Sequence, residues 1–440
     1  MSITKHLSWQ KTVFVLLNLI LVLVLQGSLT AEEIETPDAP SEITTGPAWD
    51  PIQNLSGNTF GSRLAVVRGA PNGRTVMVGF VRQMSATESD TDVYYRRSTN
   101  NGAAGSWSLV TRIHSSGGVR STELDLDYDS SNKAHAVWVE NGLQLHYAHE
   151  DDWASNTSAI RSTSATGITN PRIIASGSSN IDIVWAEFDG SQWQIFHTRS
   201  KNGGTSWAVA KNQVSVGSLD FSTRPALAVS GNTIYVVWEE GLFTAGTQYS
   251  QGTVNTTTNT VTWTTARTIS TASGATNAKQ PQITLAGNTR HVAYTERFNG
   301  TQQYIHHIQC SSNCTGATVS NNWQSRGNPI SGQVLGVHAS NPFDLTSTIS
   351  QIGGCTFVYF HGLISGNDNE QIWGTSSCGN WATSPKDEIT DFETRAIFPN
   401  MDVQNNWWVY LVFEEFVSED IRQIRFLRNV PATYIPFLSK

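Results

Sequence analysis

The stretch NIDIVWAEFDGSQWQIFHTRSKNGGTSW, from Asn180 to Trp207, decides the fold of this 440-residue chain. It predicts a short strand, a turn, a second strand and a tight loop that a tryptophan closes. β-Branched and aromatic residues crowd IDIVW and WQIFH, which suits the half-buried surface of a sheet. Asn-Gly-Gly at residues 202–204 supplies the positive φ angles that a tight turn between strands requires.

Variants of this unit occur seven times along the chain. Their second strands begin at Thr75, Ala134, Ile181, Ile234, His291, Cys355 and Val409 and read TVMVGF, AHAVWVE, IDIVWAE, IYVVWEE, HVAYTE, CTFVYFH and VYLVFEE. A first strand and a turn precede each copy, and a third strand follows it. Six units continue with a fourth strand that opens at a tryptophan: Trp107, Trp153, Trp207, Trp263, Trp323 and Trp381. The spacing of these tryptophans, 46 to 60 residues, is the size of one four-stranded propeller blade.

The seventh unit ends at RFLRNV, residues 425–430, without a fourth strand. A matching stretch, WDPIQNLS from Trp49 to Ser56, stands at the front of the chain. The sequence therefore predicts an all-β fold, a seven-bladed β-propeller of four-stranded antiparallel blades over residues 48–430. The N-terminal strand would close the last blade, which removes open sheet edges.

The two ends of the chain differ from the repeats. Residues 1–31 carry Lys5 and Lys11, then an apolar run from Val13 to Leu25, then small residues up to Ala31, which is the order of a secretory signal peptide. The run is about 13 residues, short of the roughly 20 that a membrane span needs; an uncleaved anchor is the alternative. Residues 32–47 predict a flexible acidic leader and residues 431–440 a C-terminal extension. We therefore expect a protein that is secreted or held at the cell surface.

The net charge of the protein limits the classes of partner that it is expected to bind. The formal net charge is −8, and cleavage after residue 31 would remove two lysines and no acids, giving −10. Such a protein is a poor candidate for nucleic acid or anionic membrane binding. No helix-borne His-x-x-x-His, Gly-x-Ser-x-Gly or phosphate loop occurs, so we expect no cofactor and no metal. The expected partner is an extracellular glycan or protein, bound by a monomer.

The four cysteines fit an oxidising compartment. Cys310 and Cys314 lie in one loop, CSSNC, and Cys355 and Cys378 flank a predicted hairpin whose turn falls at residues 365–369. We predict disulfides Cys310–Cys314 and Cys355–Cys378, since strand pairing would bring the second pair together. Zinc is the alternative, but neither pair has a nearby Cys or His cluster with finger spacing.

The loop SKNGGTSW resembles the Asp-box, or bacterial neuraminidase repeat, of sialidase-like propellers. The fixed positions of that motif match Ser200, Asn202, Gly204 and Trp207, and a looser copy with two extra residues is STNNGAAGSW at residues 98–107. The resemblance implies a sialidase-like fold. In that family the Asp-boxes are turn-stabilising loops away from the active site, so the motif implies no catalysis.

The resemblance also directs attention to arginines. Sialidases hold the substrate carboxylate with three arginines and use an Asp acid/base with a Tyr–Glu nucleophile pair. The family's Phe/Tyr-Arg-Ile-Pro segment is absent here, and the nearest counterparts are Arg63, Arg224 and Arg395, each just before a first strand. They form either a clamp for a carboxylate or phosphate, or a set of surface arginines. The family enzymes have six blades rather than seven, which weakens the comparison of these three arginines with those of the sialidase site.

A second set of candidates repeats with the blades. Two residues after the aromatic of the second strand stand Glu140, Glu187, Glu240, Glu296 and Glu415, with His361 in the sixth unit. Ring symmetry would place these groups around one rim, where crowded carboxylates raise one another's pKa and suit acid/base work or cation binding. The alternative is a repeated structural device in which each Glu accepts hydrogen bonds from its own or the next blade.

These observations support three functions. The first is a secreted sialidase-like propeller that binds a glycan or protein and catalyses nothing. The second is a glycoside hydrolase, exo-sialidase-like, acting at the mouth of the ring. The third is a structural component of an envelope or matrix. Propellers host all three, so the fold alone does not decide among them.

Overall fold

The computed structural model describes residues 49–57, 60–85, 89–153, 159–163, 167–207, 211–215, 221–241, 246–275, 277–299, 302–316, 318–326, 346–363, 369–378, 386–404, 406–418 and 421–429. The predicted signal peptide, acidic leader and C-terminal extension lie outside these ranges, as does Trp381. Within them, no helix is both long enough and apolar enough to cross a membrane.

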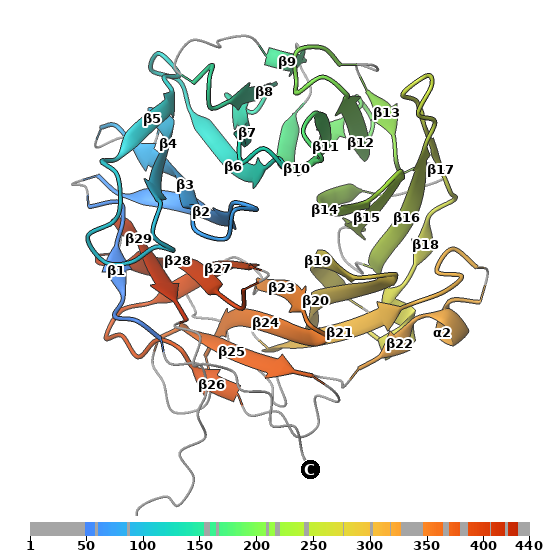
Figure 1. The fold of residues 1–440 in the computed structure, drawn as a ribbon. Helices are drawn as coiled ribbons and strands as arrows, with labels where there is room; N and C mark the ends of the chain where they lie inside the picture. Colours follow the sequence, from blue (N-terminus) through green and yellow to red (C-terminus); the bar gives the residue numbers. More distant parts are fainter. Residues whose placement is uncertain are drawn as a thin grey trace, which may run out of the picture. The chain divides into compact units, whose positions relative to one another are not determined.

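Seven antiparallel sheets follow one another as the blades of a propeller (Figure 1). Blade 1 holds β2 (Ser62–Gly69), β3 (Val76–Gln83), β4 (Thr91–Ser98) and β5 (Thr111–His114). Blade 2 holds β6 (Ser121–Tyr128), β7 (Ala134–Glu140), β8 (Gln144–His149) and β9 (Ala159–Ser162). Blade 3 holds β10 (Ile168–Ser176), β11 (Asn180–Phe188), β12 (Trp193–Ser200) and β13 (Asn212–Gln213).

The remaining blades repeat this order. Blade 4 holds β14 (Ser222–Ser230), β15 (Thr233–Glu240), β16 (Gly246–Val254), β17 (Val261–Trp263) and β18 (Arg267–Thr268), the last two both paired with β16. Blade 5 holds β19 (Ala278–Ala286), β20 (Thr289–Asn299), β21 (Gln302–Cys310) and β22 (Gln324–Ser325). Blade 6 holds β23 (Ser347–Ile352), β24 (Cys355–Gly362), β25 (Gln371–Ser377) and β26 (Lys386–Glu388). Blade 7 holds β27 (Ala396–Val403), β28 (Val409–Phe416), β29 (Arg422–Arg428) and β1 (Gln53–Asn54); a 3-10 turn, η1 (Ser270–Ser273), and a short helix, α2 (Val319–Asn322), lie in connections.

The first strands of the blades face the centre of the ring (Figure 1). Each contacts the first strand of the next blade, from β2 through β6, β10, β14, β19 and β23 to β27, and β27 contacts β2 again. The ring is thus closed at its inner wall. Because the strands of a blade alternate in direction, the second strands end at the rim where the first strands begin.

The last blade takes its outer strand from the other end of the chain. In β1, Gln53 pairs with Phe426 of β29, and Trp49 forms a further bridge to Asn429. Leu55 is buried beside this pairing, and the Ser56 hydroxyl accepts a hydrogen bond from the backbone N–H of Ile424. The pairing covers the edge of β29 with backbone partners.

The apolar core lies between neighbouring blades. Trp138, Trp185 and Trp238 of the second strands are fully buried. Trp185 packs in one cluster with Val137 and Tyr147 of the preceding blade. Because each blade buries its face against the next, no blade can form its core alone.

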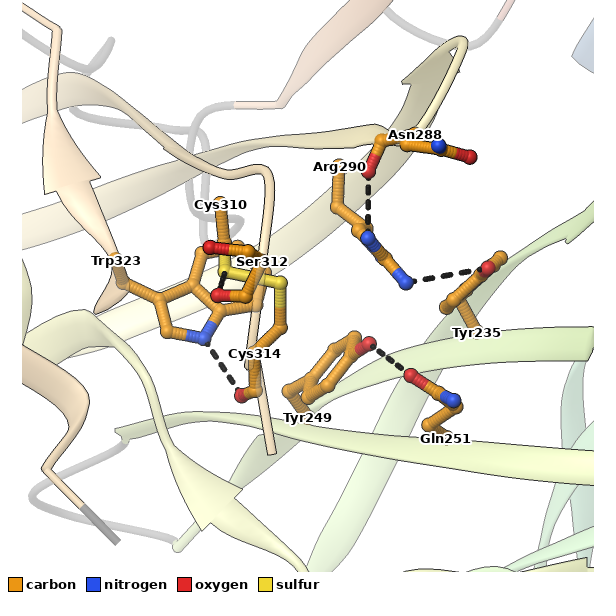
Figure 2. Close-up of a disulfide and its surroundings, with 9 residues drawn as sticks. All are labelled: Tyr235, Tyr249, Gln251, Asn288, Arg290, Cys310, Ser312, Cys314 and Trp323. Carbon is orange, nitrogen blue, oxygen red and sulfur yellow. Dashed lines mark hydrogen bonds between the residues drawn. A yellow bond between two sulfur atoms is a disulfide. The ribbon is translucent and has the colours of Figure 1, made fainter. Parts of the chain in front are cut away.

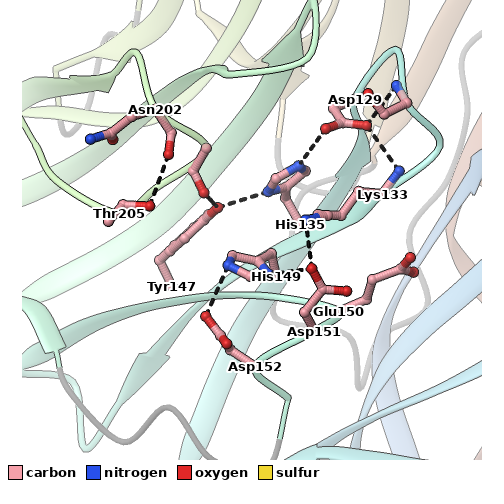
Figure 3. A network of polar contacts seen from close by, with 12 residues as sticks. Asp129, Lys133, His135, Tyr147, His149, Glu150, Asp151, Asp152, Asn202 and Thr205 are labelled. Carbon is pink, nitrogen blue, oxygen red and sulfur yellow. Dashed lines mark hydrogen bonds and ion pairs between the residues drawn. The ribbon is translucent and has the colours of Figure 1, made fainter.

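The SKNGGTSW loop joins blade 3 to blade 2. The Ser200 hydroxyl accepts hydrogen bonds from the N–H groups of Asn202 and Gly204, at 3.2 and 2.9 Å. Tyr147 of β8 donates to the Gly203 carbonyl at 2.9 Å and meets Trp207 edge-on at 5.1 Å between ring centroids. In Figure 3 its hydroxyl also lies toward His135, 2.7 Å away. The loop therefore holds the seam between two blades, where "seam" means a blade-to-blade contact.

The looser copy of the motif holds the seam between blades 1 and 7 in the same way. The Ser98 hydroxyl accepts hydrogen bonds from the N–H groups of Asn100 and Gly102, at 3.1 and 3.0 Å. Trp107 meets Phe426 of β29 edge-on, with 4.8 Å between ring centroids. Both loops thus set a tryptophan against an aromatic of the preceding blade's third strand.

Both predicted disulfides are present, Cys310–Cys314 and Cys355–Cys378. The first closes a loop beyond β21 (Figure 2), where the Trp323 indole donates to the Cys314 carbonyl at 3.0 Å. Trp323 in turn meets Tyr249 of blade 4 edge-on at 5.1 Å. The second ties β24 to the end of β25 within one blade.

Candidate functional site

A central cavity of about 1020 Å³ is lined by the first strands of all seven blades. The first strands are the innermost strands of the ring, and six of them carry a β-bulge near their start, where the register with the second strand shifts. A bulge turns a side chain out of the strand's alternation. The middle residue of each bulge has a positive φ between 49° and 59° and lines the cavity: Leu64, Glu123, Asn170, Arg224, Gln280 and Phe398.

Carboxylates of the neighbouring blade hold three of these bulges. The N–H of Leu64 donates to Glu414 at 2.6 Å, that of Asn170 to Glu123 at 2.5 Å, and that of Gln280 to Glu239 at 3.2 Å. A non-glycine residue at positive φ costs on the order of 1–3 kcal/mol and persists only where the surroundings fix it. The charged acceptors supply that constraint, and in doing so they order the cavity wall.

The other acidic residues of the wall also bind the next blade. Asp125 accepts the N–H of Ile173 at 3.1 Å, Asp127 accepts that of Ala175 at 2.8 Å, and Asp402 accepts that of Gly69 at 2.7 Å. With Glu123, these are the four carboxylates in the lining, and each is engaged in holding a first strand. First strands have an unpaired edge toward the centre, so these side chains satisfy backbone groups that pairing leaves open.

The pKa values of two of these carboxyl groups, Asp127 and Glu123, are raised. Burial raises the pKa of Asp127 to about 7, although Arg68 and the N–H of Ala175 favour its charged form. Burial likewise raises the pKa of Glu123, against the hydrogen bonds from Thr169 and Asn170. Asp127 therefore places a carboxyl group with a raised pKa in the cavity lining.

Six guanidinium groups line the same cavity, those of Arg63, Arg68, Arg120, Arg172, Arg224 and Arg422. Three form ion pairs: Arg68 with Asp125 at 3.1 Å, Arg224 with Glu239 at 2.8 Å and Arg422 with Glu414 at 2.9 Å.

Arg120 and Arg172 differ from these three. Among the residues that the structure describes, neither forms an ion pair with a carboxylate. Arg120 is exposed, and the guanidinium of Arg172 donates to the Pro171 carbonyl at 3.0 Å. Both act on the charge of Glu123, so they flank the same part of the wall, on blades 2 and 3. This part of the cavity wall carries two guanidinium groups without an ion pair among the described residues.

The three arginines predicted to form a clamp do not all lie in the cavity. Arg63 and Arg224 line the cavity, and Arg395 is absent from its lining. Arg395 binds Glu370 with nitrogen–oxygen distances of 2.7 and 3.0 Å and lies over the ring of Phe416. The sequence reasoning missed Arg68, Arg120, Arg172 and Arg422.

The predicted glutamates stand at the ends of the second strands but outside the cavity lining. Glu187 accepts hydrogen bonds from Arg161 at 2.6 Å, Lys211 at 3.0 Å and the Trp185 indole at 3.0 Å. Burial opposes its charge, and these donors outweigh burial, so the pKa of Glu187 lies below its ordinary value. The Glu187 carboxylate is thus part of a seam, and the fold itself supplies its hydrogen-bond partners.

The other members of the set also have partners in their own surroundings. Glu240 accepts from the Trp238 indole at 2.8 Å, Glu296 lies 2.8 Å from His306, and Glu415 binds Arg425. His361 is buried next to the Thr346 hydroxyl, 3.1 Å away, and burial lowers its pKa to about 4.

Glu140 is part of a different arrangement, with His114 and His146. Among the described residues, this is the group of three acidic, histidine or cysteine side chains whose donor atoms all lie within 4.8 Å of one another. The glutamates therefore do not gather into one carboxylate cluster. Their ligand role stays a prediction.

No protein family and no curated protein matches the sequence. Among solved structures, the chain is similar to Trypanosoma rangeli sialidase in complex with sialic acid, at 10% identity and a TM-score of 0.46, over 84% of this chain and 55% of that one. It is also similar to a protein of unknown function from Dyadobacter fermentans, at 10% identity and TM-score 0.49 over 87% and 99%. NanB sialidase from Streptococcus pneumoniae matches at 12% identity and TM-score 0.44 over 89% and 72%. The chain spans about half the length of the trypanosome sialidases. Similarities this weak do not assign a site or an activity to this chain.

Proposed function

We propose that this protein is a secreted, sialidase-like propeller that binds a carboxylate-bearing glycan in its central cavity without hydrolysing it. The observation that carries the proposal is that the acidic groups of the cavity wall are engaged by the fold, whereas two of its basic groups form no ion pair among the residues that the structure describes. All four lining carboxylates hold backbone N–H groups of the next blade, while Arg120 and Arg172 form no ion pair within the described residues. Guanidinium groups bind carboxylates in bidentate geometry, so an acidic sugar suits this wall.

Secretion is part of the proposal. Two disulfides fit an oxidising compartment, and residues 1–31 have the order of a signal peptide. An acidic segment of an extracellular protein would offer similar carboxylates, and the binding experiment separates the two ligands.

One observation favours the hydrolase alternative. A carboxyl group with its pKa near 7 is suited to general acid/base catalysis at neutral pH, and Asp127 is such a group in the cavity wall. Against this, its carboxylate accepts the N–H of Ala175, and the described lining contains no tyrosine for a Tyr–Glu pair. A structural role for Asp127 is therefore favoured.

A glycan array read with the purified protein tests the binding proposal, and a fluorogenic sialoside assay tests the alternative. We expect acidic glycans to bind, neutral ones of the same core to be silent, and no turnover. Binding only to neutral glycans, or only to acidic peptides, would contradict the glycan proposal. Turnover that Asp127→Asn abolishes would establish the hydrolase instead.

A further inference from the structure

A buried His–Glu–His group lies at the seam between blades 1 and 2, outside the lining of the central cavity. His114 ends β5, Glu140 ends β7 and His146 lies in β8. All three residues are at least nine-tenths buried. The Nε2 atoms of both rings face the carboxylate, at 3.5 Å for His114 and 2.9 Å for His146.

His114 departs from the repeat. In four other blades a hydroxyl residue stands two residues beyond the fourth strand, or beyond β18 in blade 4, and accepts a hydrogen bond from a backbone N–H of the third strand. These pairs are Ser56 with Ile424, Ser215 with Ile195, Ser270 with Thr247 and Thr390 with Ile372, at 2.9 to 3.2 Å. In blade 1, His114 occupies this place opposite Val93. Its imidazole reaches across the seam to Glu140 instead.

We infer that His114, Glu140 and His146 form a binding site for a divalent transition metal ion, with zinc as the first candidate. Two imidazoles and a carboxylate are a ligand set that zinc takes in proteins. Bonds of about 2.0–2.2 Å in a tetrahedral site place donor atoms about 3.3–3.6 Å apart. The observed separations are 3.5 Å from His114 to Oε1 of Glu140 and 2.9 Å from His146 to Oε2, and all three donor atoms lie within 4.8 Å of one another.

The surroundings complete the site. The Trp138 ring packs against both imidazoles, at 5.2 Å from His114 and 5.3 Å from His146, which fixes their orientation. The Gln144 side chain is at an exposed position with its oxygen 3.1 Å from His146 Nε2. It or a water molecule can take the fourth position on the solvent side. Each ring then carries its proton on Nδ1, since Nε2 must bind the metal unprotonated. The Nδ1 atom of His146 is buried and has no hydrogen-bond partner among the described residues.

Blade 5 contains the same Glu–His arrangement, and among the described residues no third metal-binding side chain joins it. Glu296 lies 2.8 Å from His306, and Tyr294 stacks on that ring with 5.4 Å between centroids, as Trp138 does on His146. In blade 4 the corresponding position, two residues after β18, is Ser270, the hydroxyl of the common repeat. A Glu–His pair alone is thus a contact within one blade, and His114, which reaches it from blade 1, is what adds a metal site.

The test is titration of the EDTA-treated, dialysed protein with zinc chloride by calorimetry, repeated with Co²⁺ to observe the visible absorption of a tetrahedral site. The full chain should bind one more zinc ion than His114→Ser, a variant that restores the residue of the other blades. Losing a direct ligand should weaken this site more than about 100-fold, because even outer-shell partners contribute about 10–100-fold.

His306→Gln is the matched control and should leave zinc binding unchanged. If His114→Ser does not fold, Glu140→Gln takes its place, since it removes a ligand charge and keeps the shape. No zinc binding by the full chain would overturn the inference. So would a stoichiometry and affinity that neither His114→Ser nor Glu140→Gln alters.

Discussion

The seams between blades and the wall of the central cavity use the same residue types for different ends. At the seam around Glu187, three donors surround one carboxylate that is almost fully buried. In the cavity wall, the carboxylates are satisfied by backbone N–H groups, and two arginines have no ion pair among the described residues. A charged group whose partners are all supplied by the fold stabilises the ring. One whose partners are not supplied is available to a ligand.

The largest effect on stability is expected at a seam glycine. A Cβ at Gly204, where φ is +87°, would lie 2.1 Å from the Tyr147 ring of the neighbouring blade. Gly204→Ala should lower the free energy of unfolding by about 2–4 kcal/mol, from overpacking and backbone strain together. Urea unfolding measures this change.

Gly203 is the matched control, since it also has a positive φ, +67°, but nothing within 4 Å of an added Cβ. Gly203→Ala should cost only about 1 kcal/mol, the backbone term alone. Equal losses in the two variants would contradict the expected overpacking against Tyr147.

The next effect concerns Glu187. Glu187→Gln keeps the shape but removes the charge that Arg161 and Lys211 bind, and should cost about 1–3 kcal/mol of stability. Binding of an acidic glycan should be unchanged, because Glu187 lies outside the cavity lining. A variant with normal melting and altered glycan affinity would move Glu187 from the seam to the ligand site.

A further effect, on the pH dependence of stability, is expected at Asp127. A carboxyl whose pKa is raised on folding, here to about 7, holds its proton more tightly in the folded state. Its contribution to stability is present below about pH 4 and is lost as the pH rises through 7. Asp127→Asn imitates the protonated form, so its stability relative to the native protein should grow between pH 4 and 8, by up to about 4 kcal/mol, since each pKa unit corresponds to about 1.4 kcal/mol. Parallel curves of melting temperature against pH would refute this.

The sequence predicts the repeats well because their signal is local. The second strands carry runs of β-branched and aromatic residues, and the turns carry glycine and asparagine, so seven blades and their strand order follow. The disulfides follow too, since each pair lies within one blade. The same locality explains why Trp138, Trp185 and Trp238 are buried, as expected for aromatics of half-buried strands.

The site was harder to predict because its residues converge from different blades. A period of two assigns alternate residues to one face, whereas the bulges break that alternation at Asn170, Arg224 and Gln280. The signal that could have located them is the proline that follows each of these residues, because proline within sheets is confined to edges and bulges. For His114, the signal is its place among the hydroxyl residues that follow the other fourth strands.

The most direct test of the central claim is the affinity of Arg120→Ala, Arg172→Ala and the double variant for the acidic glycan that the array selects, measured by calorimetry at low and high salt. Each single change should weaken binding about tenfold or more, and the double change should nearly abolish it and its salt dependence, with melting unaltered. Arg74→Ala, on an exposed turn outside the cavity lining, should bind as the native protein does. Native affinity in the double variant would contradict the account.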